Sequence, residues 1–296
     1  MGRVTERVPV VRVRYADPAA DGAGPSAADR PRSDAVAVEE PLELRLNGSV
    51  LTVTMRTPGA DIDLAHGWLL TEGIIGSVAD VRTMRYCGGS VLDADELPRN
   101  TYNVLDVELS EQARASGRAA EAVADARRLG VTTSACGICG SASIEALRAR
   151  LPDGDLARLE CAIALPDIAD LVRSLRTTQP TFVATGGTHA ALWVAPDQTQ
   201  RGSAEDVGRH NAVDKVLGAA LRAGAHPPFG GALIVSSRAS YEIVQKAAMA
   251  GVPVVIAVSA PSSLAVSAAR DLGMTLLAFA RDSGVNVYAG AHRVRP

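Results

Sequence analysis

Aromatic side chains are scarce in this chain: phenylalanine, tryptophan and tyrosine together make up 3% of its 296 residues. Hydrophobic residues nevertheless account for 47%, so the sequence predicts an aliphatic core. Neither sign of charge dominates, because the formal net charge is -3. A dedicated nucleic-acid-binding protein normally presents a basic face, and the near-neutral balance argues against that class.

Cysteine is also rare, and four cysteines are too few for a disulfide scaffold in a chain of this length. No cationic and then apolar segment of the signal-peptide kind opens the sequence. The longest apolar run, 252-VPVVIAVSA-260, is far too short to cross a bilayer. We therefore expect no membrane association and a cytoplasmic location, where a C-x-x-C pair is more often catalytic or metal-binding than structural.

The first part of the chain predicts a tail and then a small domain. Residues 1–34 are predicted to be a flexible tail, because 16–33 are rich in Ala, Asp, Gly and Pro without apolar periodicity. A smaller α+β domain is predicted for residues 35–125. Within it, alternating apolar residues on both sides of Asn47-Gly48 indicate a β-hairpin, because a tight primed turn needs two residues with positive φ. A helix follows, with Asp61 placed to cap its start and Gly73 to end it.

Residues 126–296 predict a second domain in which strands and helices alternate. A helix after Pro166 carries an apolar stripe, and further helices separate the strands from residue 189 onward. The all-apolar strands Ala232–Val235 and Val254–Val258 should be buried on both faces, as in a sheet covered by helices. This pattern predicts an α/β fold, most simply a three-layer α/β/α sandwich.

The loop 136-CGICG-140 holds two of the four cysteines. It has three functional interpretations: a zinc site, a thioredoxin-like redox pair or a sulfur carrier. A structural zinc site needs four ligands, but Cys87 and Cys161 have no close ligand partner. A deaminase-type zinc site needs H-x-E upstream of P-C-x-x-C, and here Ala135 precedes Cys136 without such a motif. A thioredoxin-like pair would require a βαβ context that is missing, but the spacing permits a disulfide between Cys136 and Cys139, so a redox-sensitive loop stays open as a side behaviour. We therefore expect no metal at this loop.

The third interpretation is a sulfur carrier. Gly137 and Gly140 leave the backbone free, and a helix beginning near Ser141 or Ser143 would lower the pKa of a thiol that faces its N-terminus. A thiolate on an exposed arm can attack a persulfide and pass the terminal sulfur on. The plain alternative is two unreactive cysteines in a glycine turn, since a lone C-x-x-C is a weak motif.

Several longer stretches carry a family resemblance. They are 39-EEPLELRLNG-48, 53-VTMRTPGADIDLAHGWLLTEGII-75, 136-CGICG-140, 185-TGGTHAA-191, 205-EDVGRHNAVDKVLG-218, 240-SYEIVQKAAMAGVPVVIAVSAPSSLAV-266 and 276-LLAFARDSGVNVY-288. With these stretches in family order from about Ala35 onward, the sequence resembles the FdhD family, the sulfur carrier proteins needed for active formate dehydrogenase.

The resemblance implies a sulfurtransferase. Cys136 would take sulfur from a cysteine desulfurase as a persulfide, with Cys139 as its companion. The sulfur would pass to the molybdenum bis(molybdopterin guanine dinucleotide) cofactor before its insertion into formate dehydrogenase. The resemblance also implies a homodimer, and a cytidine-deaminase-like fold without zinc for the C-terminal domain.

By motif position, the cofactor's nucleotide would bind at the segment between the last two predicted strands. This segment comprises Phe279, Ala280, Arg281, Asp282, Ser283 and Gly284. We add Arg238, because a guanidinium at the carboxyl end of an apolar strand suits a diphosphate. Ser237 before it replaces the glycine that relatives often carry, so the backbone there would approach a phosphate less closely.

His210 is the remaining candidate for a contact with the cofactor. Its alternative interpretation is an ordinary surface or interface histidine. Asp206 would cap the same helix, whereas Lys215 and Lys246, in the middle of helices, are expected to be solvated. A second function class is a chaperone that only holds the dinucleotide cofactor, with incidental cysteines. A third is a zinc-dependent nucleoside deaminase, which would have to bind stoichiometric zinc.

Overall fold

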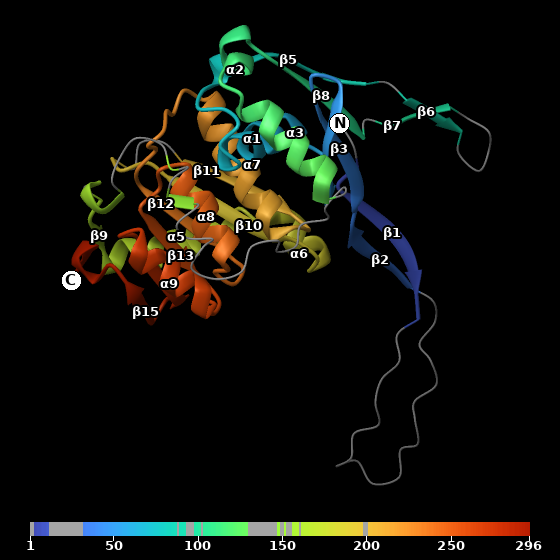
Figure 1. The fold of residues 1–296 in the computed structure, drawn as a ribbon. Coiled ribbons are helices and arrows are strands. Elements are labelled where there is room, and N and C mark those ends of the chain that lie inside the picture. Colours follow the sequence, from blue (N-terminus) through green and yellow to red (C-terminus); the bar gives the residue numbers. More distant parts are fainter. Residues whose placement is uncertain are drawn as a thin grey trace, which may run out of the picture.

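The computed structural model describes most of the chain, which folds as a mixed α/β protein (Figure 1). The described residues are 3–11, 32–87, 89–92, 98–101, 103–129, 147–148, 151, 156–159, 161–197 and 201–296. No helix within these ranges is long and apolar enough to span a membrane.

A six-stranded sheet with the strand order β11-β10-β12-β13-β14-β15 forms the centre of the molecule. Strands β12, β13 and β14 are parallel, and the outer pairings are antiparallel. The alternation of strands and helices in the sequence predicts every strand of this sheet except the polar edge strand β11. The strands are β10 (His189–Val194), β11 (Arg201–Asp206), β12 (Ala232–Val235), β13 (Val254–Ala257), β14 (Thr275–Arg281) and β15 (Gly284–Ala289).

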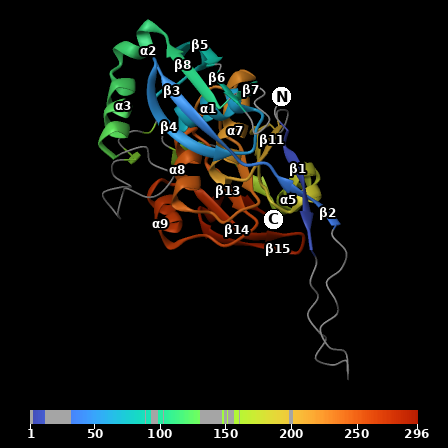
Figure 2. The ribbon, with the colours of Figure 1, turned by 90° about the vertical axis from the view of Figure 1, so that its right-hand side faces the viewer.

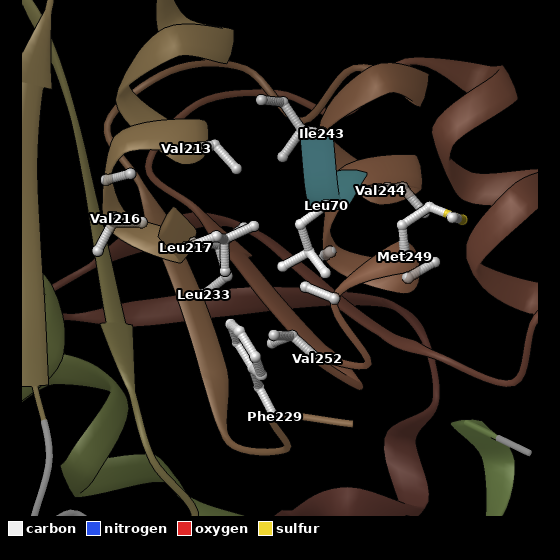
Figure 3. Close-up of a cluster of buried hydrophobic side chains, with 14 of the residues drawn as sticks. Leu70, Val213, Val216, Leu217, Phe229, Leu233, Ile243, Val244, Met249 and Val252 are labelled. Carbon is white, nitrogen blue, oxygen red and sulfur yellow. The ribbon is translucent and has the colours of Figure 1, made fainter. Parts of the chain in front are cut away.

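Helices cover both faces of this sheet, so β12 and β13 are buried throughout, as predicted. Leu233 belongs to the core that the sheet shares with α7, α8 and α9, whereas Ile234 faces the core shared with α5. Figure 3 shows the first of these cores, where Phe229 and Val252 lie next to Leu233. The helices are α5 (Leu165–Thr177), α6 (Pro180–Thr185), α7 (Arg209–Arg222), α8 (Tyr241–Met249) and α9 (Ser263–Asp271).

The N-terminal part contains a second sheet with the strand order β4-β3-β8-β5. Its predicted hairpin is confirmed, with Asn47 at φ 50° and Gly48 at φ 80° in the turn. The elements are β3 (Glu40–Leu46), β4 (Ser49–Arg56), α1 (Asp61–Thr71), η1 (Val78–Asp80), β5 (Val81–Tyr86), β6 (Gly89–Leu92), β7 (Pro98–Thr101), β8 (Val104–Leu109), α2 (Glu111–Ala115) and α3 (Arg118–Leu129).

Helices α1 and α7 cross at two glycines. A β-carbon on Gly67 would lie 1.8 Å from the carbonyl oxygen of Asp214, and one on Gly218 would lie 1.9 Å from that of Asp63. The two backbones are therefore in direct contact, and one hydrophobic core extends from the N-terminal sheet to the central sheet. The predicted domain boundary at residue 125 stays a prediction.

The flexible tail predicted for residues 1–34 is wrong for the part that the structure describes. Strand β1 (Thr5–Val10) pairs antiparallel with β2 (Arg32–Ala37), and the ribbon projects from the body beside α6 (Figures 1 and 2). Half-buried Val8 and Val10 alternate with exposed residues in β1. Residues 12–31 lie outside the described residues.

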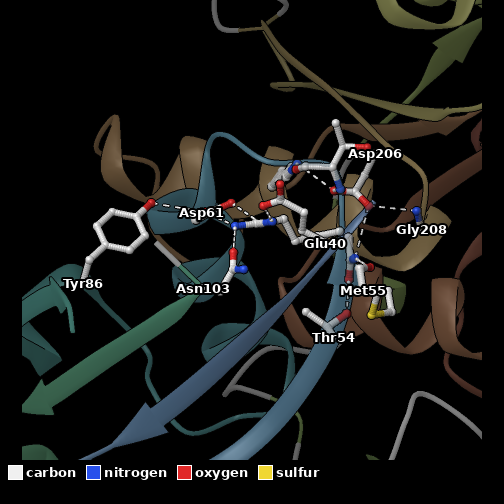
Figure 4. Close-up of polar contacts among 12 residues, drawn as sticks. Glu40, Thr54, Met55, Asp61, Tyr86, Asn103, Asp206 and Gly208 are labelled. Atoms are coloured by element: carbon white, nitrogen blue, oxygen red, sulfur yellow. Dashed lines mark hydrogen bonds and ion pairs between the residues drawn. The ribbon is translucent and has the colours of Figure 1, made fainter. Parts of the chain in front are cut away.

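The predicted capping role of Asp61 is also wrong. Ala60 is the N-cap of α1 with φ 53°, and Asp61 is the first helical residue. Its carboxylate instead accepts two hydrogen bonds from the buried Arg56 guanidinium, at 2.9 and 3.0 Å. Tyr86 and Asn103 complete this network (Figure 4), so the charge pair connects α1 to β4 and β5 of the second sheet.

The C-terminus returns to the segment that precedes α5. Strand β16 (Val294–Arg295) pairs parallel with β9 (Ile163–Ala164). Buried Arg293, in η3 (Ala291–Arg293), donates to the carbonyl oxygens of Leu156 and Ala157 at 2.6 and 3.1 Å. These bonds hold η2 (Leu156–Arg158) against the end of the chain.

Candidate functional site

A pocket of about 640 Å³ opens where β12 and β13 end, between α5, α6 and the start of β10. Ser236 and Val258, which follow these two strands directly, form its floor, and His189 of β10 also lines it. The carboxyl edge of parallel strands is where open α/β sheets tend to bind ligands. The volume lies within the range of small-molecule sites, roughly 300–1,000 Å³.

One wall of the pocket is α6 and the turn that follows it. Phe182 and Val183 come from the helix, and Gly186, Gly187 and Thr188 come from the turn. Gly186 has φ 67°, the left-handed conformation that ends a helix most easily at glycine. Sequence reasoning missed α6, although Pro180 at its first position is a typical helix-start signal.

The predicted nucleotide-binding segment covers the end of β14 from Phe279, the turn of Asp282 and Ser283, and Gly284 at the start of β15. Phe279 has the left-handed φ of 52° and is 43% exposed, and the register shifts between Ala278 and Arg281. Ala280 is buried in the core shared with α5, whereas residues 281–284 are exposed. A large side chain with positive φ is uncommon and strained.

Two residues of this segment contact residues that line the pocket. The Arg281 guanidinium donates to the carbonyl oxygen of Val258, and Asp282 forms an ion pair with Arg176 at 3.3 Å. Arg173 reaches the same carboxylate at 3.9 Å. The structure therefore brings Arg281 and Asp282 to the rim of the pocket, next to exposed basic side chains.

His210 lies in the first turn of α7, and its Nε2 is 2.7 Å from Oε2 of Glu242 in α8. The hydrogen bond from His210 lowers the pKa of Glu242. Burial lowers the pKa of His189, and the positive charges of Arg209 and His210 lower it further. His210 is thus within electrostatic reach of a histidine that lines the pocket.

Arg238 follows β12 and its side chain is exposed. The hydroxyl of buried Ser237 donates to the Arg238 carbonyl oxygen at 3.1 Å. In the described structure this hydroxyl is engaged by the backbone, and the pocket residues do not include Arg238.

Lys215 of α7 and Lys246 of α8 are buried in ion pairs, although the sequence suggests that both are solvated. Asp206 is fully buried and lies 2.6 Å from the Lys215 ammonium, while Lys246 lies 2.8 Å from Asp214. The expectation that both lysines are solvated is wrong, because each neutralises a carboxylate in the core. The predicted capping role of Asp206 is wrong, because Gly208 is the N-cap of α7 and the helix has no side-chain capping bond. Asp206 Oδ1 instead accepts from the Gly208 amide ahead of the helix (Figure 4).

Cys136 and Cys139 lie outside the described residues. The other two cysteines, Cys87 and Cys161, are free and half-buried. Burial raises the pKa of the Cys161 thiol, which donates to the Gly231 carbonyl oxygen at 3.3 Å. Cys161 is therefore a poor nucleophile. Among the described residues, no cluster of three or more His, Cys, Asp or Glu side chains is arranged to hold a metal ion.

Comparison with known proteins gives consistent matches over the whole chain. The model of the FdhD/NarQ family matches residues 37–295. A sulfur carrier protein FdhD from Nocardia farcinica is 49% identical, over 99% of this chain and 96% of the relative. The protein of the same name from Streptomyces coelicolor is 47% identical, over 99% of this chain and 97% of the relative.

A solved structure has the same fold. It is described as a formate dehydrogenase accessory protein from Desulfotalea psychrophila and superimposes with a TM-score of 0.67 at 21% identity. The alignment covers 99% of this chain and 100% of that one. The match of the family model and the identity to full-length relatives lead to one conclusion: the chain belongs to the FdhD/NarQ family.

Proposed function

We propose that this chain carries sulfur for the maturation of formate dehydrogenase, and that the sulfur is held as a persulfide on Cys136. The Cys136 thiolate attacks the outer sulfur of a persulfide on a cysteine desulfurase. The new S–S bond forms as the donor's S–S bond breaks, and the donor cysteine leaves as a thiolate, so the exchange needs no external oxidant. Cys139 assists or resolves the persulfide.

The acceptor is the molybdenum of the bis(molybdopterin guanine dinucleotide) cofactor, which is cargo for this chain. When the persulfide S–S bond breaks, its electron pair stays on Cys136, and the metal supplies the pair that binds the released sulfur. The observation that carries this proposal is the 136-CGICG-140 loop in a chain that matches the family over residues 37–295.

Intact-mass spectrometry after incubation with a cysteine desulfurase and cysteine tests the relay. The wild type and Cys139→Ala are expected to gain about one sulfur atom, and Cys136→Ala none. Absence of added sulfur on every variant, with a competent desulfurase present, would leave the cofactor-holding chaperone as the better account. A chaperone would also keep its activity in Cys136→Ala.

We further propose that the pocket binds the guanine nucleotide part of the cofactor. Its position at the carboxyl ends of β12 and β13 and the nearby Arg281 support this assignment. In this proposal Asp282 lies with Arg281 at the rim of the pocket. Phe279, Ala280, Ser283 and Gly284 of the same segment are further candidate contacts, as are His210 in the first turn of α7 and Arg238 after β12. Calorimetric titration with guanosine diphosphate tests the assignment, with adenosine diphosphate as the control.

Three further proposals follow from the family. The helix-covered sheet is a three-layer sandwich of the cytidine-deaminase type, which a superposition on that fold tests. The chain is a cytoplasmic homodimer, which analytical ultracentrifugation tests for its oligomeric state and fractionation for its location. It binds no zinc, and stoichiometric zinc in elemental analysis would instead favour a deaminase.

A further inference from the structure

The carboxylate of Glu205 in β11 accepts three hydrogen bonds from the segment that forms a wall of the pocket. The amide of Thr181 donates to Oε2 at 2.9 Å, and the amide of Phe182 donates to Oε1 at 2.8 Å. The hydroxyl of Thr188 donates to Oε1 at 2.8 Å. One side chain therefore joins the start of α6 to the turn after its end.

Besides its contact with β2, helix α6 is fixed mainly by this carboxylate. It has six residues, none of them buried, and its N-cap Gln179 forms no side-chain capping bond. Val183 is 81% exposed. A helix this short is marginal without partners for its first amides, and Glu205 supplies a negatively charged acceptor for two of them.

Glu205 itself is held firmly. It is paired with Ala190 in the antiparallel ladder of β10 and β11. Its carbonyl oxygen accepts from the buried Lys215 ammonium at 3.5 Å, and the next residue, Asp206, is buried in an ion pair with the same lysine. The anchor for α6 is thus part of the central sheet.

The geometry points to Glu205 as a positioning residue that sets the shape of the pocket by fixing α6 and Thr188. This inference rests on the proposed nucleotide-binding function of the pocket. Both carboxylate oxygens already accept hydrogen bonds from the wall, so Glu205 acts through α6 and does not take the ligand itself. Loss of the carboxylate frees the wall and weakens binding without changing any residue that lines the pocket.

Calorimetric titration of the full chain with guanosine diphosphate tests the inference. Glu205→Ala is expected to bind about tenfold more weakly than the wild type, and Glu205→Gln to fall between them, because its amide keeps only one acceptor oxygen. Thr188→Val removes a single bond and should cost roughly threefold in affinity. Because Thr188 itself lines the pocket, Glu205→Gln is the milder variant that keeps the test decisive where Glu205→Ala does not fold.

Asp80→Ala is the matched control. Asp80 also caps a short helix, with Oδ2 accepting from the amides of Gly76 and Ser77 at 2.7 and 2.9 Å, but in the N-terminal part. The Asp80→Ala variant should be less stable than the wild type but should bind guanosine diphosphate with unchanged affinity. In Glu205→Ala, hydrogen exchange should accelerate at Thr181 and Phe182, and sulfur loading of Cys136 should be unchanged.

Two results would overturn the inference. Unchanged affinity in both Glu205→Ala and Glu205→Gln, with a wild type that binds, would refute the positioning role alone. A wild type that does not bind guanosine diphosphate would refute the nucleotide pocket and the positioning role together. Neither result affects the sulfur carrier proposal, which the mass measurement tests separately.

Discussion

Lys246 donates to both carboxylate oxygens of Asp214, at 2.9 and 2.8 Å, in the interior where α1, α7 and α8 meet. Thr71 of α1 donates to the same carboxylate at 2.9 Å. Two opposite charges and a hydroxyl thus satisfy one another away from water. This arrangement is stable only while every member is present, because an unpaired buried charge is costly.

Removing either Asp214 or Lys246 alone should therefore lower the free energy of unfolding more than replacing both. Asp214→Ala or Lys246→Ala is expected to cost about 3–5 kcal/mol, because the remaining charge is left buried without a counterion. Urea denaturation measures this loss. The double variant Asp214→Leu with Lys246→Met should be clearly more stable than either single variant, and a simple sum of the two losses would contradict this explanation.

Alanine at the α1–α7 crossing should be poorly tolerated. A methyl group on Gly67 or Gly218 would overlap a backbone carbonyl, and backbone cannot move aside as a side chain can. We expect a loss of about 3 kcal/mol or more, at or beyond the upper end of overpacking effects. Gly76→Ala is the control, because the nearest atom to its β-carbon is 3.8 Å away. Equal melting temperatures for all three variants would contradict the close contact.

The Glu242–His210 contact should make the folded chain less stable as the pH falls into the acidic range. A carboxyl whose pKa is lowered on folding stabilises the folded chain above its unfolded pKa, ordinarily 4.5 for glutamate, and this contribution is lost as pH falls through the lowered value. Glu242→Gln should therefore be less stable than the wild type at pH 7, by at most about 1 kcal/mol for this half-exposed pair.

The difference between Glu242→Gln and the wild type should vanish in strong acid. Protonation of His189 destabilises both proteins equally, so comparing them isolates Glu242. Exposed Glu39 provides the control substitution Glu39→Gln, which should have little effect at either pH. Denaturation curves at neutral and acidic pH measure the effect, and a difference that persists unchanged into acid would show that the charge of Glu242 is irrelevant.

Cys136 and Cys161 should differ in their rate of thiol labelling. Burial raises the pKa of Cys161, so iodoacetamide should modify it much more slowly than Cys136 in the folded chain. Peptide mass spectrometry after short labelling measures the rates, and unfolding in urea should remove the difference. Cys161→Ser should still take sulfur from the desulfurase. Faster labelling of Cys161 than of Cys136 would argue against Cys136 as the carrier.

Local patterns in the sequence predict much of the fold. The Asn47-Gly48 turn, the apolar strands β12 and β13, and the stripe of Ile168, Leu171 and Val172 in α5 each depend on neighbouring residues, and all are confirmed. Strand β11 escaped prediction because its residues are mostly polar, and β1 because its stability comes from a strand that follows some twenty residues later.

The site is harder to predict, because its geometry depends on long-range partners. The α6 amides that donate to Glu205 lie 23 and 24 residues away in the sequence, and Lys246 contacts Thr71 at a sequence separation of 175 residues. A lysine with a distant carboxylate is indistinguishable in sequence from a solvated one. Motif position assigned Arg281 and Asp282 to the segment between the last two strands, but nothing in the sequence indicated that Arg176 would pair with Asp282.

The glycine crossing of α1 and α7 has a mechanical consequence. Two helices whose backbones touch can neither slide nor pivot without losing a contact that no side chain could replace. The N-terminal sheet and the central sheet therefore have no hinge between them at this crossing. Any movement that accompanies the proposed sulfur transfer has to leave the crossing intact.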